Sequence, residues 1–204
     1  MAVSRPPEGW LVPAPSQALE GTDSFAGVDV TVLDFWRWAF SDLRDNTQRG
    51  VLAEFLVALA LGRTETRRKA WDNHDVTTRS GLRIEVRASG YLQSWAQATH
   101  SRLSFGRIIA RTWDANTNEF GAEPEVRADV FVFSVQTCKD PQRYDALDIS
   151  QWEFYVVAAD RVRECRYKSV SIAWVRKHAD PLPFSDLAAA IEHVGRGGST
   201  HLPA

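Results

Sequence analysis

The chain has 204 residues, a formal net charge of −2, and 44% hydrophobic and 25% charged residues. This length fits one domain that buries a large core without disulfide staples, and the apolar content excludes wholesale disorder. No apolar run approaches the length of a membrane span, and the N-terminus lacks the apolar core of a signal peptide. Because the two cysteines are few and far apart in the sequence, we expect a cytoplasmic protein.

Positive charge gathers in the middle of the chain. Residues 62–111 contain ten Lys and Arg against four Asp and Glu, a balance of +6 that leaves −8 for the rest. A basic segment within an acidic chain favours a surface for a polyanion, although ordinary scatter of solvated arginines gives the same count. The sequence has no glycine-rich phosphate loop, so intrinsic nucleotide hydrolysis is not supported.

The N-terminal part predicts an irregular arm followed by two helices. Residues 1–29 hold four of the nine prolines and show no lasting periodicity. Thr31 and Asp34 have the spacing of a capping box, so a helix is expected to begin there. A second helix is expected from Asn46 to Gly62. Because residues 51–61 are apolar on every side except at Glu54, this helix is expected to be largely buried.

A β-hairpin is predicted next, with strands over residues 74–78 and 82–88. The second strand alternates apolar and polar side chains with a period of two. Residues 79–81 form the predicted three-residue turn, in which Gly81 takes the left-handed conformation.

The remainder predicts strands that complete one sheet. We expect a helix over 91–99, a strand over 102–109, a loop over 113–125, buried strands over 129–135 and 152–158, an edge strand over 169–175 and a last helix over 185–194. The fold class is therefore mixed α/β (α+β). We assign one domain to residues 30–194, preceded by the arm at 1–29 and followed by a flexible tail at 195–204.

The hairpin spacing brings two acids together. A turn centred on Ser80 pairs residues whose numbers sum to 160, which places Asp75 opposite Glu85 at about 5 Å between Cβ atoms. Facing carboxylates repel each other, and a hard divalent cation such as Mg²⁺ relieves this repulsion. Glu54 lies among uncharged helical neighbours, so it also needs a cation or a shared proton. With Arg87 on the same strand face as Glu85, these residues predict a metal site that takes a phosphodiester.

A plain network of ion pairs explains the same residues. Arg83 and Arg87 flank Glu85 in the sequence, so the two arginines could neutralise both hairpin carboxylates. Glu54 could likewise pair with a buried arginine. Both interpretations stay open at this point.

The order of Glu54 on a helix, Asp75 before a turn, and the run Ile84-Glu85-Val86-Arg87 resembles the PD-(D/E)XK phosphodiesterase superfamily, which has the restriction-endonuclease-like fold. The resemblance covers about residues 46–157. The runs RGVLAEFLVALALG, IEVRASGYLQSW, RADVFVF and WEFYVV are also similar to an uncharacterised bacterial family of this fold, with an IEV(K/R)xSxYLQSW-type motif.

This resemblance implies a central mixed β-sheet flanked by helices and a catalytic site on it. Asp75, Glu85 and Glu54 would bind Mg²⁺ or Mn²⁺. Gln93, in YLQSW, resembles a glutamine that helps to position substrate, and Arg79 and Arg83 are further candidates for substrate binding. A helix-surface amide explains Gln93 equally well.

Arg87 departs from the superfamily pattern, which has lysine at this position. An arginine stays protonated at any working pH, so Arg87 cannot be a general base. It could still hold a water or stabilise charge on the transferring phosphate, and the metal must then lower the pKa of the water.

We therefore expect a metal-dependent nuclease, a hydrolase of phosphodiester bonds, with Glu54, Asp75, Glu85 and Arg87 as catalytic residues. Its partner would be nucleic acid, DNA rather than RNA, with no membrane association and with room for a homodimer. The alternative is a nucleic-acid-binding protein of the same fold that has lost turnover. A protein-interaction module is the third interpretation.

Overall fold

The computed structural model describes residues 6–14, 17–65, 67–68, 72–165 and 167–198. Parts of the predicted arm (residues 1–5 and 15–16) and of the predicted tail (199–204) lie outside the described residues.

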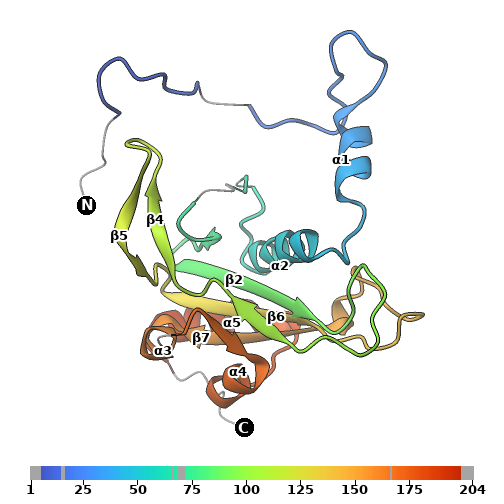
Figure 1. Cartoon of the computed structure of the whole chain (residues 1–204), viewed down its shortest axis with the longest axis vertical. Helices are drawn as coiled ribbons and strands as arrows, with labels where there is room; N and C mark the ends of the chain where they lie inside the picture. The colour runs from blue at the N-terminus through green and yellow to red at the C-terminus, as the bar shows by residue number, and fades with distance from the viewer. Residues whose placement is uncertain (1–5, 15–16, 66, 69–71, 166, 199–204) are drawn as a thin grey trace.

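Figure 1 shows the arrangement of the elements. The helices are α1 (Val32–Phe40), α2 (Asn46–Ala60), α3 (Ala159–Cys165), α4 (Ile172–His178) and α5 (Phe184–Gly195), with a single 3₁₀ turn over Ile149–Gln151. The strands are β1 (Val76–Thr77), β2 (Arg83–Gly90), β3 (Ser104–Gly106), β4 (Ala110–Asp114), β5 (Glu119–Glu125), β6 (Val130–Gln136), β7 (Trp152–Ala158) and β8 (Ser169–Ser171).

A four-stranded mixed sheet in the order β1-β2-β6-β7 forms the centre of the molecule. β2 and β6 run parallel, while β1 with β2 and β6 with β7 run antiparallel. All seven residues of β6 are buried, as a central strand covered on both faces requires. The sequence therefore predicted the mixed α/β class and both apolar strands correctly, although β7 is the last strand in the sheet order and only β6 is central.

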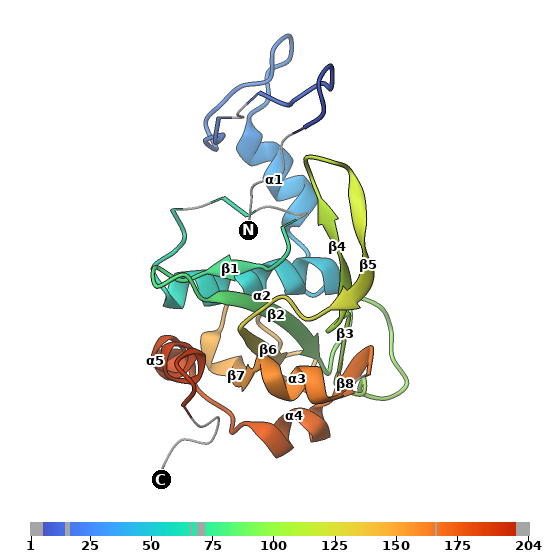
Figure 2. The same cartoon turned by 90° about the vertical axis from the view of Figure 1, so that its left-hand side faces the viewer.

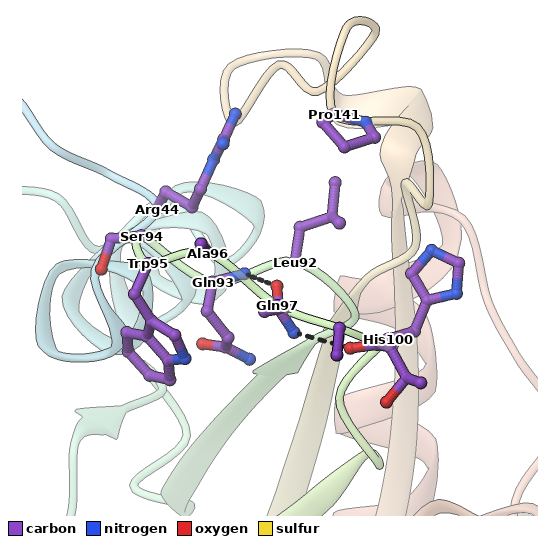
Figure 3. A pocket seen from close by; sticks show the side chains of 11 residues that line it. Arg44, Leu92, Gln93, Ser94, Trp95, Ala96, Gln97, His100 and Pro141 are labelled. Atoms are coloured by element: carbon purple, nitrogen blue, oxygen red, sulfur yellow. Dashed lines mark hydrogen bonds between the residues drawn. The ribbon is translucent and has the colours of Figure 1, made fainter.

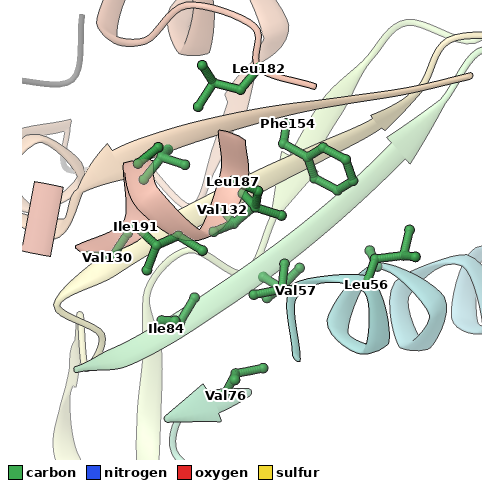
Figure 4. Packing of buried hydrophobic residues seen from close by; sticks show 14 of the residues in the cluster. Leu56, Val57, Val76, Ile84, Val130, Val132, Phe154, Leu182, Leu187 and Ile191 are labelled. Atoms are coloured by element: carbon green, nitrogen blue, oxygen red, sulfur yellow. The ribbon is translucent and has the colours of Figure 1, made fainter. Parts of the chain in front are cut away.

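Helices cover both faces of this sheet (Figure 2). On one face, α2 and α5 pack over a core that includes Val57, Ile84, Val132 and Ile191 (Figure 4). On the opposite face, α3 and α4 pack with β3 and β8 over the alternate side chains of β6 and β7, among them Phe133. Side chains alternate between the two faces of a sheet along a strand. Successive residues of β2 therefore face the two layers in turn.

The predicted hairpin forms in the predicted register. Val76 pairs with Ile84 and Thr77 with Arg83, so the partners sum to 160. Gly81 has φ +91°, which is the left-handed conformation that the turn needs. β1 has only two residues, so the pairing stops just before it reaches Asp75.

Four segments differ from the sequence prediction. Residues 91–99 are irregular rather than helical, because the amide of Gln97 bonds the backbone of Gln93, Tyr91 and Thr99 and so competes with helical bonds. Residues 113–125, predicted as a loop, belong to the β4–β5 hairpin, which turns through a left-handed Asn118. The predicted strand over 102–109 is only β3, and the predicted edge strand over 169–175 divides into β8 and α4.

The first two helices form as predicted but are less buried. The capping box is present, since Asp34 N–H donates to Oγ1 of Thr31 and Thr31 N–H donates to Oδ2 of Asp34. Figure 1 shows α1 standing away from the sheet, and Val32 is its one buried residue. In α2, Phe55 and Leu59 are 51% and 46% exposed, because only one side of the helix faces the sheet. None of the helices in the described part of the chain has the length and apolar character that crossing a bilayer requires.

A buried arginine fixes α2 on the sheet. Arg49 is 2% exposed and forms no salt bridge among the described residues. Its Nη2 donates to the carbonyl oxygens of Arg44 (2.6 Å) and Leu92 (2.7 Å), and its Nη1 donates to Oδ1 of Asn46 (3.0 Å). The guanidinium rests against Gly90, where a Cβ atom would lie 3.1 Å from Cζ. Arg49 therefore joins the start of α2 to the end of β2.

We expect Arg49→Lys to lower the free energy of unfolding by about 3 kcal/mol. A lysine ammonium cannot reach the three acceptors at once, and a buried carbonyl left without a donor is costly. Urea denaturation measures the change. Arg37→Lys on the exposed side of α1 is the matched control and is expected to change stability by less than about 0.5 kcal/mol; equal effects of the two variants would contradict this role of Arg49.

Candidate functional site

Asp75 lies at the centre of the candidate site, directly before the first residue of β1. Its backbone N–H donates to the carbonyl oxygen of Ile84 (2.9 Å), and its Oδ2 accepts the backbone N–H of Val86 (2.7 Å). The side-chain carboxylate of Asp75 thus accepts a hydrogen bond from β2 that a backbone carbonyl would accept in a longer β1. This bond places Asp75 beside Glu85, the position that the register predicts for it.

Glu85 and Arg87 project from the face of β2 that carries no α2. Their parallel partners on β6 are Phe131 and Phe133, which belong to the core under α3 and α4. The guanidinium of Arg87 donates to Glu85, and its Nη1 lies 3.7 Å from Oδ2 of Asp75. Arg87 therefore bridges the two hairpin carboxylates.

Glu54 approaches Asp75 from the α2 side of the sheet. Its side chain is 12% exposed, and both of its oxygens are held by Arg68: Nε donates to Oε2, and Nη2 donates to Oε1 (2.9 Å). The sequence could not identify this partner, because Arg68 follows in an irregular loop. Instead of the buried arginine considered from the sequence, Glu54 pairs with a side chain that is 42% exposed.

The buried position of the acids raises their pKa values. Burial, reinforced by the negative charge of Glu54, raises the pKa of Asp75 to about 6, although the Val86 N–H, Arg87 and Arg68 oppose the shift. Burial raises the pKa of Glu85 to about 7; Arg87 opposes this shift, and Asp75 and Glu54 add to it. Two arginines thus leave three neighbouring carboxylates short of positive charge.

A cavity of about 840 Å³ opens beside Glu54 and Asp75. This volume lies within the range of ligand-binding pockets. Three arginines of the loop after α2, Arg63, Arg67 and Arg68, contribute to its wall. These arginines belong to the basic segment at residues 62–111, but the site predicted from the sequence did not include them. Their spacing directly after the Glu54 helix is the signal that could have identified them.

The other predicted substrate residues do not line this cavity. Arg83 pairs with Asp129 at 2.6 Å, so it does not neutralise Glu85. Arg79 is exposed in the hairpin turn. Gln93 lines a second cavity, of about 660 Å³, at the opposite end of β2, together with Arg44, Trp95 and others (Figure 3).

The amide of Gln93 holds its own loop in place. Its Nε2 donates to the carbonyl oxygen of Gly90 (3.1 Å) and to Oγ of Ser101 (3.0 Å), while its Oε1 lies 3.5 Å from Nη1 of Arg49. The side chain is buried, so these bonds use the amide within the protein. The structure therefore gives Gln93 a positioning role on the loop rather than a contact with the acids.

The carboxylates suit a hard cation in chemistry but are occupied in this conformation. Among the described ranges, no group of three His, Cys, Asp or Glu side chains is arranged to hold a metal ion. In the same conformation, Arg68 contacts both oxygens of Glu54, and Arg87 contacts Asp75 and Glu85. A metal ion would therefore need these guanidinium groups to move.

A family model described as bacteriophage T4 endonuclease IV matches residues 38–173, which are 136 of the 204 residues. The chain belongs to the bacteriophage T4 endonuclease IV family. The part matched to the endonuclease IV model extends from α1 into α4 and contains the three acids, Arg68 and Arg87. A search of curated proteins finds no match to the chain.

We expect Glu85→Gln to stabilise the protein in EDTA at pH 8 by about 1–2 kcal/mol and to have little effect at pH 5. The pKa of Glu85 is raised in the folded state to about 7, so its stabilising protonation is lost as the pH rises through 7. At pH 8 the variant removes a buried charge, whereas at pH 5 glutamine replaces an acid that is already neutral.

Urea denaturation at the two pH values measures this difference. Glu123→Gln removes an exposed carboxylate from β5 and serves as the control. A loss of stability in Glu85→Gln at pH 8 would show that the ion pair with Arg87 outweighs the cost of burial.

Proposed function

We propose that this member of the endonuclease IV family is a Mg²⁺- or Mn²⁺-dependent nuclease of the PD-(D/E)XK type. One observation carries the proposal: the charge of Glu54 raises the pKa of Asp75, and the charges of Asp75 and Glu54 raise that of Glu85, while Glu54 and Asp75 line a cavity with three arginines in its wall. A divalent cation supplies the missing charge, and a phosphodiester suits the arginines.

The arrangement of the elements supports the restriction-endonuclease-like assignment. The helix with Glu54, the hairpin with Asp75 and the strand with Glu85 are consecutive in the chain, and β6 extends the sheet parallel to β2. A mixed sheet flanked by helices is what the resemblance implies. The endonuclease IV family match covers all of these elements.

In the proposed mechanism, Asp75 and Glu85 would hold the metal, and Glu54 would bind the metal or its water. The metal supplies positive charge and lowers the pKa of a water molecule. The bond from the Val86 N–H fixes one oxygen of Asp75, so its carboxylate keeps its orientation. Arg87 stays protonated, so it stabilises negative charge on the phosphate or orients the water instead of accepting a proton.

The proposal includes DNA rather than RNA as the polymer, with the arginine-walled cavity as the place where its backbone enters. Electrostatic attraction of phosphates does not distinguish the two polymers, so the cleavage assay below decides between them. A homodimer is also compatible with the proposal, and sedimentation of the purified protein decides this point.

A nucleic-acid-binding protein without turnover is the second candidate. The contacts of Arg87 favour it, because this guanidinium occupies both Glu85 and Asp75, and its buried Nε has no hydrogen-bond partner among the described residues. Such a protein would bind nucleic acid equally well in EDTA and in Mg²⁺.

We expect the wild-type protein to cleave nucleic acid in Mg²⁺ or Mn²⁺ and not in EDTA. Glu85→Ala should lower the rate about 100-fold or more, because it removes a metal ligand. The assay uses labelled duplex DNA, single-stranded DNA and RNA in parallel. Glu123→Ala, on the exposed β5 strand, controls for the loss of a carboxylate. Metal-independent binding without cleavage of any polymer would favour the second candidate.

We expect Arg87→Lys to raise the metal-dependent rate at pH 8 by about tenfold, since a lysine can lose its proton and act as a base. The variant should also add a rise with pH to the rate profile. Arg87→Met is the comparison, because it removes the charge and keeps much of the side-chain length. Equal loss of activity in both variants would show that the reaction depends on the guanidinium itself.

A further inference from the structure

Arg68 and Glu54, which both line the arginine-walled cavity, form a two-point ion pair. Two nitrogens of the guanidinium donate to the two oxygens of the carboxylate, so another cation must compete with Arg68 for both oxygens. Glu54 is nearly buried, whereas Arg68 is half-exposed on the cavity wall. The arginine side of this pair therefore meets whatever enters the cavity.

The neighbouring arginines have other partners. Nε of Arg63 donates to the carbonyl oxygen of Thr77 (3.1 Å), and its Nη1 pairs with Glu65 (2.7 Å). Nη1 of Arg67 donates to the carbonyl oxygen of Gln17 (3.2 Å). Among these three cavity arginines, Arg68 is thus the one paired with an acid of the candidate site.

We propose that Arg68 binds a backbone phosphate of the substrate and that, in doing so, it releases Glu54 to the metal. The guanidinium passes from the carboxylate to the non-bridging oxygens of a phosphodiester, and both oxygens of Glu54 then face a divalent cation. Arg68 is therefore a phosphate-binding residue and the element that couples substrate binding to metal binding. This inference rests on the proposed nuclease function.

The exchange is chemically balanced. A guanidinium presents the same pair of parallel N–H groups to a carboxylate and to a phosphate, so two charge-assisted hydrogen bonds replace two others. The cation replaces the positive charge that Arg68 withdraws from Glu54. In the free protein, by contrast, a cation must compete with Arg68 for the same oxygens.

The coupling is reciprocal. If phosphate binding frees Glu54 for the cation, then the cation, by taking Glu54, frees Arg68 for phosphate. Each ligand alone therefore binds more weakly than it does in the presence of the other. Both halves can be measured without any cleavage.

The first measurement is Mn²⁺ binding by calorimetry to the whole chain without nucleic acid. We expect Arg68→Gln to bind Mn²⁺ at least about fivefold more tightly than the wild type, because it removes the competitor for Glu54. Arg67→Gln removes the same charge from the same cavity wall, and we expect a change below about twofold. In a Glu54→Gln background, Arg68→Gln should have no effect on Mn²⁺ affinity.

The second measurement is oligonucleotide binding in EDTA, by fluorescence anisotropy. Glu54→Gln should tighten binding several-fold because it releases Arg68, and Glu54→Gln with Arg68→Gln should lose this gain. Asp72→Asn, which removes a carboxylate from the same cavity, controls for the general loss of negative charge. Circular dichroism shows whether each variant is folded, and Arg68→Lys, which cannot hold both oxygens, gives an intermediate Mn²⁺ affinity if Arg68→Gln is unfolded.

The outcomes separate this inference from the proposed function. Mn²⁺ binding that Glu85→Ala abolishes and Arg68→Gln leaves unchanged would overturn the exchange while the metal site stands. Absence of Mn²⁺ binding in the wild type and in Arg68→Gln would overturn both. Equal effects of Arg68→Gln and Arg67→Gln would show that charge alone acts, and would also overturn the exchange.

Discussion

The bonds of Arg49 determine where the candidate site is. This guanidinium connects the start of α2 to the end of β2 through backbone carbonyl oxygens, and it lies against a glycine that leaves it room. Glu54 follows five residues later on the same helix, so its position over β2 depends on that anchor. A buried cation without an acidic partner among the described residues is acceptable here because several oxygens surround it.

The candidate site places three carboxylates and two arginines at the edge of the sheet. Asp75 occupies the edge, Glu54 approaches from one layer and Glu85 from the other, and each outer acid has its own arginine. Two guanidinium groups carry the charge of one divalent cation. Against three partly buried carboxylates this charge is one short, in agreement with the raised pKa values of Asp75 and Glu85 in the free protein.

The sequence predicted those features that depend on neighbouring residues. The register of the hairpin follows from the three-residue turn at Gly81, and the strands β6 and β7 follow from continuous apolar runs. The partner of Glu54 could not be predicted, because it lies fourteen residues away in a loop without periodicity. Nor could the irregular segment after β2, where the Gln97 side chain takes the place of helical bonds. Side-chain hydrogen bonds that leave no periodic pattern in the sequence decided both cases.

The bond between Asp75 and the Val86 N–H ties the position of this candidate metal ligand to the backbone of β2. One oxygen of this carboxylate already accepts a hydrogen bond from the sheet, which fixes how the carboxylate faces a ligand. Under the proposed function, the number of residues in the turn at 79–81 is therefore constrained. An insertion of a single residue there would move Asp75 along β2 and exchange its bonded neighbour, so related proteins that keep the activity should vary freely in the identity of these turn residues but not in their number.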